Sequence, residues 1–254
     1  MSTTQRPSGS GPAAASTPRV PARRRRRAWV LELYRSYVGK KYVMAVTGIV
    51  LMLYVALHMI ANLKVYFGPE SINRYGEFLR EFGEPALPRT VFLWIVRVGL
   101  ITAFVLHVHA AYGLTRANWR AAPPLRRYRS RRDYVAADFA SRTMRWTGVI
   151  VLLFVLFHLM DLTWGNANPE FVRGDVYNNL VASFSRWPVA VVYVVANLAL
   201  GLHLYHGAWS LFQSLGWNNR RFNHWRRWFA IAFAVAVTAG NVTFPIAVLT
   251  GVVS

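Results

Sequence analysis

Five long apolar segments constrain this chain more than any other feature of its sequence. At a rise of about 1.5 Å per residue, each is long enough to cross roughly 30 Å of hydrocarbon as a helix. A single apolar segment inside lipid can satisfy all of its backbone polar groups only as a helix. The sequence therefore predicts an all-α integral membrane protein, a bundle of five transmembrane helices at about residues 42–66, 90–115, 144–165, 188–214 and 228–252.

The composition favours a membrane protein over a nucleic-acid-binding protein. Hydrophobic residues make up 54% of the chain and charged residues only 16%. A formal net charge of +20 alone would be typical of a nucleic-acid binder. The basic residues lie in blocks between the apolar segments, however, which is their usual distribution in membrane proteins, so we expect no nucleic-acid partner. The absence of cysteine excludes disulfides, iron–sulfur ligation and covalent c-type haem attachment.

The chain divides into a tail and a membrane domain. Residues 1–28 are rich in Ser, Pro, Ala, Gly and Arg, which predicts a disordered basic tail, and residues 29–254 form the membrane domain. The basic run from Arg23 to Arg27 is followed by amphipathic residues 29–41, without a short apolar region and a cleavage site, which argues against a signal peptide. No internal repeat is evident.

The distribution of arginine predicts how the helices are oriented. The tail and the connections at 116–145 and 215–228 are strongly basic, whereas the 67–89 and 166–187 loops balance arginine with carboxylates. Positively charged loops remain on the cytoplasmic side of a membrane. We therefore expect the N-terminus in the cytoplasm and the C-terminus outside.

Six of the seven histidines lie within the predicted spans. A lone intramembrane histidine is more often a packing or hydrogen-bonding residue than a ligand. The predicted helix directions, however, place His58 and His158 at nearly the same depth, about two-thirds of the way to the outer face. His107 and His203 are level with each other near the cytoplasmic face. Each pair joins two spans that run in the same direction.

Such pairs suit the chemistry of a haem. The macrocycle is flat and apolar, and its iron accepts two axial imidazoles from opposite faces. The sequence predicts two b-type haems, an outer one between His58 and His158 and an inner one between His107 and His203. Arg97 lies at roughly the depth of the outer pair and is a candidate partner for a haem propionate. Alternatively, the Arg97 side chain extends to the membrane interface and binds no propionate.

Two of the remaining histidines are alternative inner ligands. His109 lies two residues after His107 and points to a different side of its helix, and His206 lies three residues after His203 and shares its broad face. Either could be a ligand instead or could hydrogen-bond a propionate. Asp161 lies near the end of its span. Capping of the helix or solvation at the interface is one interpretation, and a role in proton handling is the other.

Six segments occur in an order and spacing that are specific together, although each alone is a weak signal. They are Ser36-x-x-Gly39-Lys40-Lys41-x-x-Met44-Ala45-x-Thr47-Gly48, His58-Met-Ile-Ala-Asn62-Leu63-Lys64, Tyr75-Gly76-Glu77-Phe78-Leu79-Arg80-Glu81, Phe157-His158-Leu159-Met160-Asp161-Leu162-Thr163, Ser183-Phe184-Ser185-Arg186-Trp187-Pro188 and His203-Leu-Tyr-His206-Gly207. In these segments the chain resembles the membrane-anchor cytochrome b subunit of succinate dehydrogenase, of the five-helix di-haem type and especially its actinobacterial branch. The resemblance covers about residues 34–252.

The resemblance implies a role and a set of partners. A flavoprotein subunit would oxidise succinate, an iron–sulfur subunit would relay the electrons, and both would dock on this chain at the cytoplasmic face of a bacterial plasma membrane. The chain would not act on succinate itself. It would pass electrons through the inner and then the outer haem to a quinone, which is menaquinone in this branch. A higher oligomer is compatible with the sequence.

The family's ligand pattern agrees with the depth pairing, because its first and third helices ligate the outer haem and its second and fourth the inner one. On the second helix the pattern is divided. The His109-Ala-Ala-Tyr-Gly stretch resembles the ligand segment of some relatives, whereas His107 followed by Leu114-Thr115-Arg116 matches the actinobacterial form. On the fourth helix, a histidine four residues before a glycine favours His203 with Gly207.

Other interpretations remain open. Glu77, Arg80 and Glu81 in the outer loop are candidates for the quinone or its proton path, with ordinary ion pairing on an interfacial helix as the favoured alternative. A fumarate reductase anchor, in which electrons run from quinol to fumarate, would have the same sequence features. Two interpretations from other classes are a transporter whose histidines relay protons and a haem-free structural anchor.

Overall fold

The computed structural model describes residues 27–121, 135–217, 219 and 223–254. The predicted disordered tail lies outside these residues, except for the two residues that open the first helix. The described residues form helices and no strands, which confirms the all-α prediction. The elements are α1 (Arg27–Arg35), α2 (Tyr37–Asn62), the 3₁₀ helix η1 (Leu63–Phe67), α3 (Pro69–Glu81), α4 (Val91–Ala121), α5 (Val135–Leu162), α6 (Val176–Ser185), α7 (Trp187–Ser214) and α8 (Asn223–Leu249).

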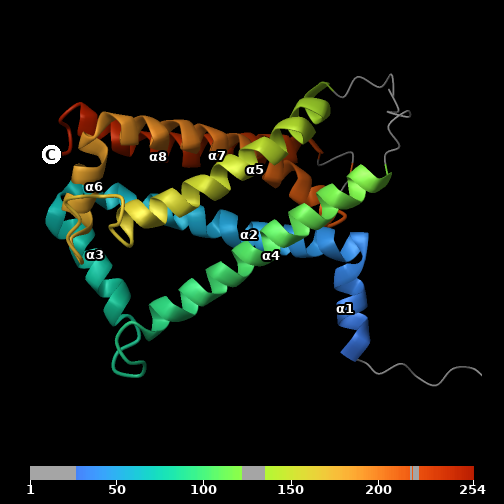
Figure 1. Cartoon of the computed structure of the whole chain (residues 1–254), viewed down its shortest axis with the longest axis horizontal. Helices are drawn as coiled ribbons and strands as arrows, with labels where there is room; N and C mark the ends of the chain where they lie inside the picture. Colours follow the sequence, from blue (N-terminus) through green and yellow to red (C-terminus); the bar gives the residue numbers. More distant parts are fainter. Residues whose placement is uncertain (1–26, 122–134, 218, 220–222) are drawn as a thin grey trace, which may run out of the picture.

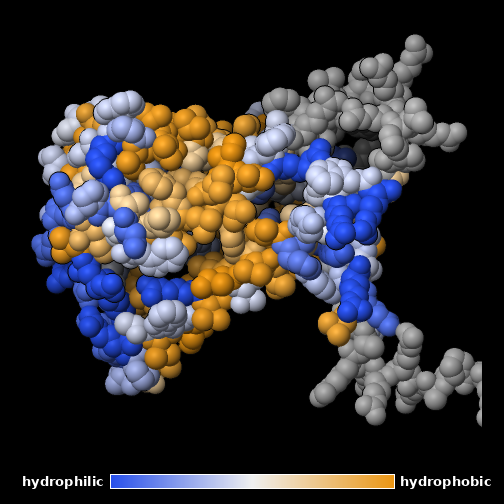
Figure 2. All heavy atoms as spheres, viewed as in Figure 1, coloured by the Kyte–Doolittle hydropathy of each residue, from blue (hydrophilic) through white to orange (hydrophobic). Residues whose placement is uncertain are grey.

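Five of these helices are long and apolar enough to cross a membrane, and they lie where the sequence predicts them. They are α2 continued by η1, α4, the 143–162 part of α5, α7 and α8. Figure 2 shows apolar side chains across the middle of the molecule and hydrophilic side chains gathered towards its two ends. The prediction of five transmembrane helices is therefore confirmed.

A sharp bend separates the amphipathic α1 from the first spanning helix (Figure 1). The Ser36 hydroxyl caps α2 by accepting a hydrogen bond of 2.9 Å from the backbone N–H of Gly39. A Cβ at Gly39 would lie only 1.7 Å from the backbone carbonyl oxygen of Leu33, so a side chain does not fit there. Glycine is required at this bend, and it allows α1 to turn away from the bundle.

The spanning helices form two similar halves and one additional helix. The first half is α2, η1, α3 and α4, and the second is α5, α6 and α7, so each has two long helices joined through a short one. Figure 1 shows α3 and α6 at the same end of the molecule. Within each half the long helices pack against each other, and α8 packs along α7. The end with α3 and α6 is called the loop end below, and the opposite end is called the basic end.

The two halves also share a sequence pattern. Met-x-x-Thr-Gly followed by histidine at the tenth position after the glycine occurs at Met44, Thr47, Gly48 and His58, and again one hundred residues later at Met144, Thr147, Gly148 and His158. The expectation that the chain has no internal repeat was therefore wrong. Both halves run from the basic end to the loop end and back, so the two copies of the pattern have the same direction (Figure 1).

Hydrogen bonds connect the two halves at the loop end. The Asn73 side chain in α3 accepts from the backbone N–H groups of Val176 (2.8 Å) and Tyr177 (3.1 Å) and donates to the carboxylate of Asp175 (3.1 Å). Asp175 caps α6 by accepting from the backbone N–H of Asn178, and this hydrogen bond lowers the pKa of Asp175. These contacts fix α6, and the start of α7 after it, relative to the first half.

Candidate functional site: two histidine pairs

An outer pair of histidines lies between the first and third spanning helices. The ring centres of His58 in α2 and His158 in α5 are 5.9 Å apart, and the ring planes are perpendicular at 89°. Tyr54 stacks on His58 at 5.4 Å, and Phe154 lies beside His158 at 5.9 Å. Each aromatic ring precedes its histidine by four residues and so shares its helix face. The two halves therefore contribute equivalent groups to this pair.

An inner pair lies between the second and fourth spanning helices. The ring centres of His107 in α4 and His203 in α7 are 6.4 Å apart, with an angle of 68° between the planes. The glycine of each repeated motif lies against one of these rings. A Cβ at Gly48 would be 3.6 Å from Cε1 of His107, and a Cβ at Gly148 would be 3.5 Å from Cε1 of His203. Larger side chains at either glycine would occupy the space of the imidazole.

The threonine of each repeated motif orients the same two imidazoles. The hydroxyl oxygen lies 3.2 Å from Nδ1 of His107 for Thr47 and 3.4 Å from Nδ1 of His203 for Thr147. Each hydroxyl donates its own proton to a backbone carbonyl one turn earlier, at 2.7 Å for Thr47 and 2.9 Å for Thr147. The threonine oxygen can then accept from Nδ1–H, and the backbone of Met44 or Met144 also hydrogen-bonds the ring of His107 or His203. With the proton on Nδ1, Nε2 is the nitrogen that can ligate a metal.

Both ring separations fit a metal held between two imidazoles. A metal–imidazole bond is about 2 Å long, and a ring centre lies about 1 Å beyond its ligating nitrogen, so two imidazoles on opposite sides of one metal have ring centres roughly 6 Å apart. The observed separations are 5.9 and 6.4 Å. The described residues contain no group of three or more His, Cys, Asp or Glu side chains that could hold a metal ion. The remaining ligands would come from the bound group itself, as a porphyrin supplies them.

The pairs lie at different depths, as the sequence predicts. His107 contacts Gly48, which precedes His58 by ten residues in α2, and His203 contacts Gly148, which precedes His158 by ten residues in α5. Ten helical residues span about 15 Å. The two pairs are therefore separated by roughly this distance along the bundle.

The alternative histidines are engaged elsewhere. The Tyr34 hydroxyl of α1 hydrogen-bonds Nδ1 of His109, and the two rings stack with centres 5.8 Å apart. His206 is buried, and its Nε2 lies 3.3 Å from the hydroxyl of Thr143. The structure thus brings His107, and not His109, to face His203. The ligand roles themselves stay a prediction.

A buried polar network adjoins the outer pair. The carboxylate of Asp161 has no exposed surface and accepts hydrogen bonds from the Ser183 and Tyr193 hydroxyls and from the Arg186 guanidinium. The Tyr193 bond is 2.9 Å long and the Arg186 bond 2.7 Å. The Tyr193 oxygen also lies 3.4 Å from Nδ1 of His158, whose Nε2 therefore stays free. Asp161 is thus connected to His158 through the Tyr193 hydroxyl, and its hydrogen bonds come from side chains and not from the end of a helix.

Arg97 takes the place in the first half that Tyr193 takes in the second. It precedes His107 by ten residues, as Tyr193 precedes His203. Its guanidinium carbon lies 5.2 Å from the ring centre of Trp94. The structure therefore places Arg97 at the depth of the outer pair, and its role as a propionate partner stays a prediction.

The sequence reasoning quoted Thr47 and Gly48 only as part of the resemblance, without a role, and it missed Thr147, Gly148 and Tyr193. The repeat could have identified the threonines and glycines, because both copies of Thr-Gly precede a histidine by the same spacing. Tyr193 carries no such signal. It is one of 12 tyrosines, and its function depends on the fold around Asp161.

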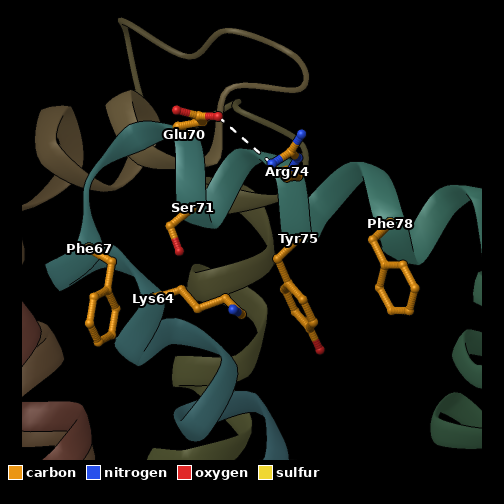
Figure 3. A pocket seen from close by; sticks show the side chains of 7 residues that line it. All are labelled: Lys64, Phe67, Glu70, Ser71, Arg74, Tyr75 and Phe78. Carbon is orange, nitrogen blue, oxygen red and sulfur yellow. Dashed lines mark ion pairs between the residues drawn. The ribbon is translucent and has the colours of Figure 1, made fainter.

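A pocket of about 650 Å³ opens at the loop end between η1 and α3. Figure 3 shows its lining side chains, which are Lys64, Phe67, Glu70, Ser71, Arg74, Tyr75 and Phe78. The Lys64 ammonium lies 5.6 Å from the ring centre of Tyr75. The pocket therefore combines two cations, a carboxylate and hydroxyl groups with aromatic walls.

The three predicted quinone candidates lie on α3 but do not line this pocket. The carboxylate of Glu77 forms ion pairs with Arg80 and with Arg89. Desolvation raises the pKa of Glu77, but the two guanidinium groups outweigh it and hold that pKa below its usual value. Glu81 lies at the end of α3. A quinone role for Glu77, Arg80 and Glu81 stays a prediction.

Five spanning helices around two facing imidazole pairs define a class: a multi-pass membrane protein with two sites where a metal complex fits between imidazoles. Residues 120–243 match the family described as succinate dehydrogenase/fumarate reductase transmembrane subunit. This match covers just under half of the chain, and its range includes His158 and His203. It confirms the resemblance at the level of that family, whose description includes both enzymes. Searches of curated proteins and of solved structures found no match.

Proposed function

We propose that this chain is the membrane-anchor cytochrome b subunit of a succinate:quinone oxidoreductase and holds two b-type haems. The outer haem would lie between His58 and His158 and the inner haem between His107 and His203. The observation that carries the proposal is that the two imidazoles of each pair lie opposite each other, with steeply inclined ring planes and ring centres 5.9 and 6.4 Å apart. Haem iron held in this way supplies one-electron redox chemistry.

The chain's own residues set the environment of each site. Thr47 and Thr147 fix the orientation of the inner imidazoles and raise their basicity as ligands, and Tyr193 does so for His158. Apolar spanning helices surround both pairs and exclude water, which lowers the local dielectric. Arg97 supplies a cation at the depth of the outer pair for a propionate.

The proposed partners follow from the family match and the charge distribution. A flavoprotein subunit and an iron–sulfur subunit would dock at the basic end, which the positive-inside rule assigns to the cytoplasm of a bacterial cell. Electrons would enter at the inner pair and leave from the outer pair to menaquinone. In a fumarate reductase the same residues would serve electron flow in the opposite direction.

A reduced-minus-oxidised spectrum of the purified chain tests this proposal. We expect the α-band of b-type haem and a content of two haems per chain. A protein that lacks the α-band after expression with haem supplied would contradict the proposal, and would leave the transporter and the haem-free anchor. A single haem would contradict the assignment of two sites.

The glycines beside the inner pair give a graded prediction. Gly148→Ala is expected to keep both haems, because its Cβ would make an ordinary contact of 3.5 Å with His203. Gly148→Leu is expected to displace the imidazole and remove the inner haem, as is Gly48→Leu beside His107. Haem content per protein measures the result, and Gly99→Leu, where nothing lies within 4 Å of an added Cβ, is the matched control. If Gly48→Leu and Gly148→Leu both retain two haems, His107 and His203 do not ligate a haem from these positions.

We further propose that the loop-end pocket receives the quinone ring. Its Lys64 ammonium and its Tyr75 and Ser71 hydroxyls can donate hydrogen bonds to quinone oxygens, and its phenylalanines provide apolar walls. Lys64 follows His58 by six residues, so the pocket adjoins the outer pair.

The pocket is tested by quinone kinetics in the assembled complex. Lys64→Met is expected to raise the KM for quinone at least about tenfold, which corresponds to the loss of one charge-assisted hydrogen bond, with haem content unchanged. Tyr75→Phe is expected to act in the same direction and less strongly. Glu81→Gln, from the same helix but outside the pocket, is the control. An unchanged KM in Lys64→Met together with a raised KM in Glu81→Gln would instead support the predicted role of the α3 carboxylates.

A further inference from the structure

A buried arginine lies at the basic end without a complete set of hydrogen bonds. Arg226, in the first turn of α8, is only 5% exposed. Its Nε and Nη1 atoms are buried and have no hydrogen-bond partner among the described residues. Its guanidinium carbon lies 5.0 Å from the ring centre of Trp209 in α7, a cation–π contact that leaves those N–H groups unsatisfied. Such a charge requires an anion nearby.

The two helices that line the surroundings of Arg226, α7 and α8, do not supply that anion. No acidic residue follows Asp175 in the sequence, so α7, α8 and the segment between them contain none. Arg227, the next residue in α8, adds a second positive charge. The counter-ion of Arg226 therefore comes from outside these elements.

Arg226 lines a pocket of about 520 Å³ between the ends of α7 and α8. The other lining residues are Phe212, Gly216, Trp217, Asn219, Trp225 and Phe229. Phe212 follows His203 by nine residues, two and a half helical turns, and so lies on the opposite face of α7. The pocket consequently faces away from the inner histidine pair and is separate from the proposed haem sites.

The pocket combines features that suit a phosphate attached to acyl chains. The N-terminal end of α8 and the unsatisfied Arg226 N–H groups attract a phosphate anion. The remaining walls are largely aromatic and would pack against hydrocarbon. Trp217 and Trp225 are 66% and 71% exposed, and tryptophan concentrates at the level of lipid headgroups. A free phosphate ion would leave these aromatic walls in contact with water.

We propose that this pocket binds the phosphate headgroup of an anionic phospholipid, with Arg226 as its main ligand. Basic pockets between spanning helices are a recognised mode of anionic lipid binding. The proposal does not depend on haem or on the function of the histidine pairs.

Thermal unfolding of the full chain in detergent tests the proposal. Phosphatidylglycerol is expected to raise the Tm of the wild type by at least about 4 °C, because a ligand that binds only the folded state stabilises it. Phosphatidylcholine and inorganic phosphate are expected to have no such effect. Arg226→Gln is expected to weaken phosphatidylglycerol binding at least about tenfold. Arg227→Gln, which removes the exposed neighbouring charge, is the matched control and is expected to bind as the wild type does.

Several results would overturn the proposal. An equal Tm shift with inorganic phosphate would assign the pocket to a free anion. Equal effects of the two lipids, or equal loss of binding in both arginine variants, would exclude a specific headgroup site and leave a partner protein's carboxylate as the counter-ion. If Arg226→Gln does not fold, Arg226→Lys together with the wild-type lipid comparison provides the same test, since a point charge without the planar guanidinium is expected to bind more weakly.

Discussion

His107→Ala is expected to lower the haem content of the purified protein from two per chain to one. The imidazole of His107 lies opposite that of His203, and no other described histidine faces that position. His203→Ala is expected to remove the same inner haem, because one axial ligand alone would leave the iron without its second bond from the protein. Haem per protein, measured together with the reduced-minus-oxidised spectrum, gives the result.

His109→Ala is the matched control for this experiment. It removes an imidazole two residues away that hydrogen-bonds Tyr34, so both haems are expected to remain. His58→Ala and His158→Ala are expected to remove the outer haem and leave the inner one. Loss of a haem in His109→Ala with both retained in His107→Ala would show that the assignment on α4 is wrong.

Asp161→Ala is expected to destabilise the protein by roughly 3–5 kcal/mol, since it leaves a partner of a buried ion pair without its counter-charge. The carboxylate is fully buried and accepts bonds from α6, from the start of α7 and from the residue between them. Arg186 is 32% exposed and can partly rehydrate, which places the expected loss near the lower end of this range. A lowered Tm of the purified chain is the measurement.

Ser183→Ala separates the charge from the hydrogen bonding in this network. It removes one neutral donor to Asp161 and is expected to cost only about 1 kcal/mol. Equal Tm values for Asp161→Ala and the wild type would show that the carboxylate is not needed to hold α5, α6 and α7 together. If Asp161→Ala changes only the spectrum of the outer haem and leaves the Tm unchanged, the carboxylate affects His158 without contributing to stability.

The sequence was sufficient for the five spans and for the pairing of histidines by depth. A single apolar segment in lipid satisfies its backbone hydrogen bonds only as an α-helix. Because the rise per residue of a helix is fixed, the position of a histidine in the sequence gives its depth in the membrane. The choice between His107 and His109 did not follow from spacing, because it depends on the rotation of α4. In the structure Thr47 and Gly48 of α2 lie against His107, whereas Tyr34 of α1 contacts His109.

The network around Asp161 could not be read from the sequence for a related reason. Its donors come from α6, from Arg186 at the junction and from α7, and the loop fold that assembles them is set by Asn73 in the other half. The repeat is difficult to recognise in the sequence because only a few positions are identical in its two copies. The other positions are apolar residues, which can replace one another in lipid. The structure shows that the recurring threonine and glycine of both copies contact an imidazole.

The duplicated architecture has a consequence for assembly. Each imidazole pair takes one ring from the first half and one from the second, so neither half can grip a cofactor without the other. Two separately synthesised fragments, divided in the connection between α4 and α5, would have to associate before either prosthetic group could be retained. Under the proposed function, haem insertion would therefore require both halves to associate, and a fragment without its partner would lack the absorption of haem.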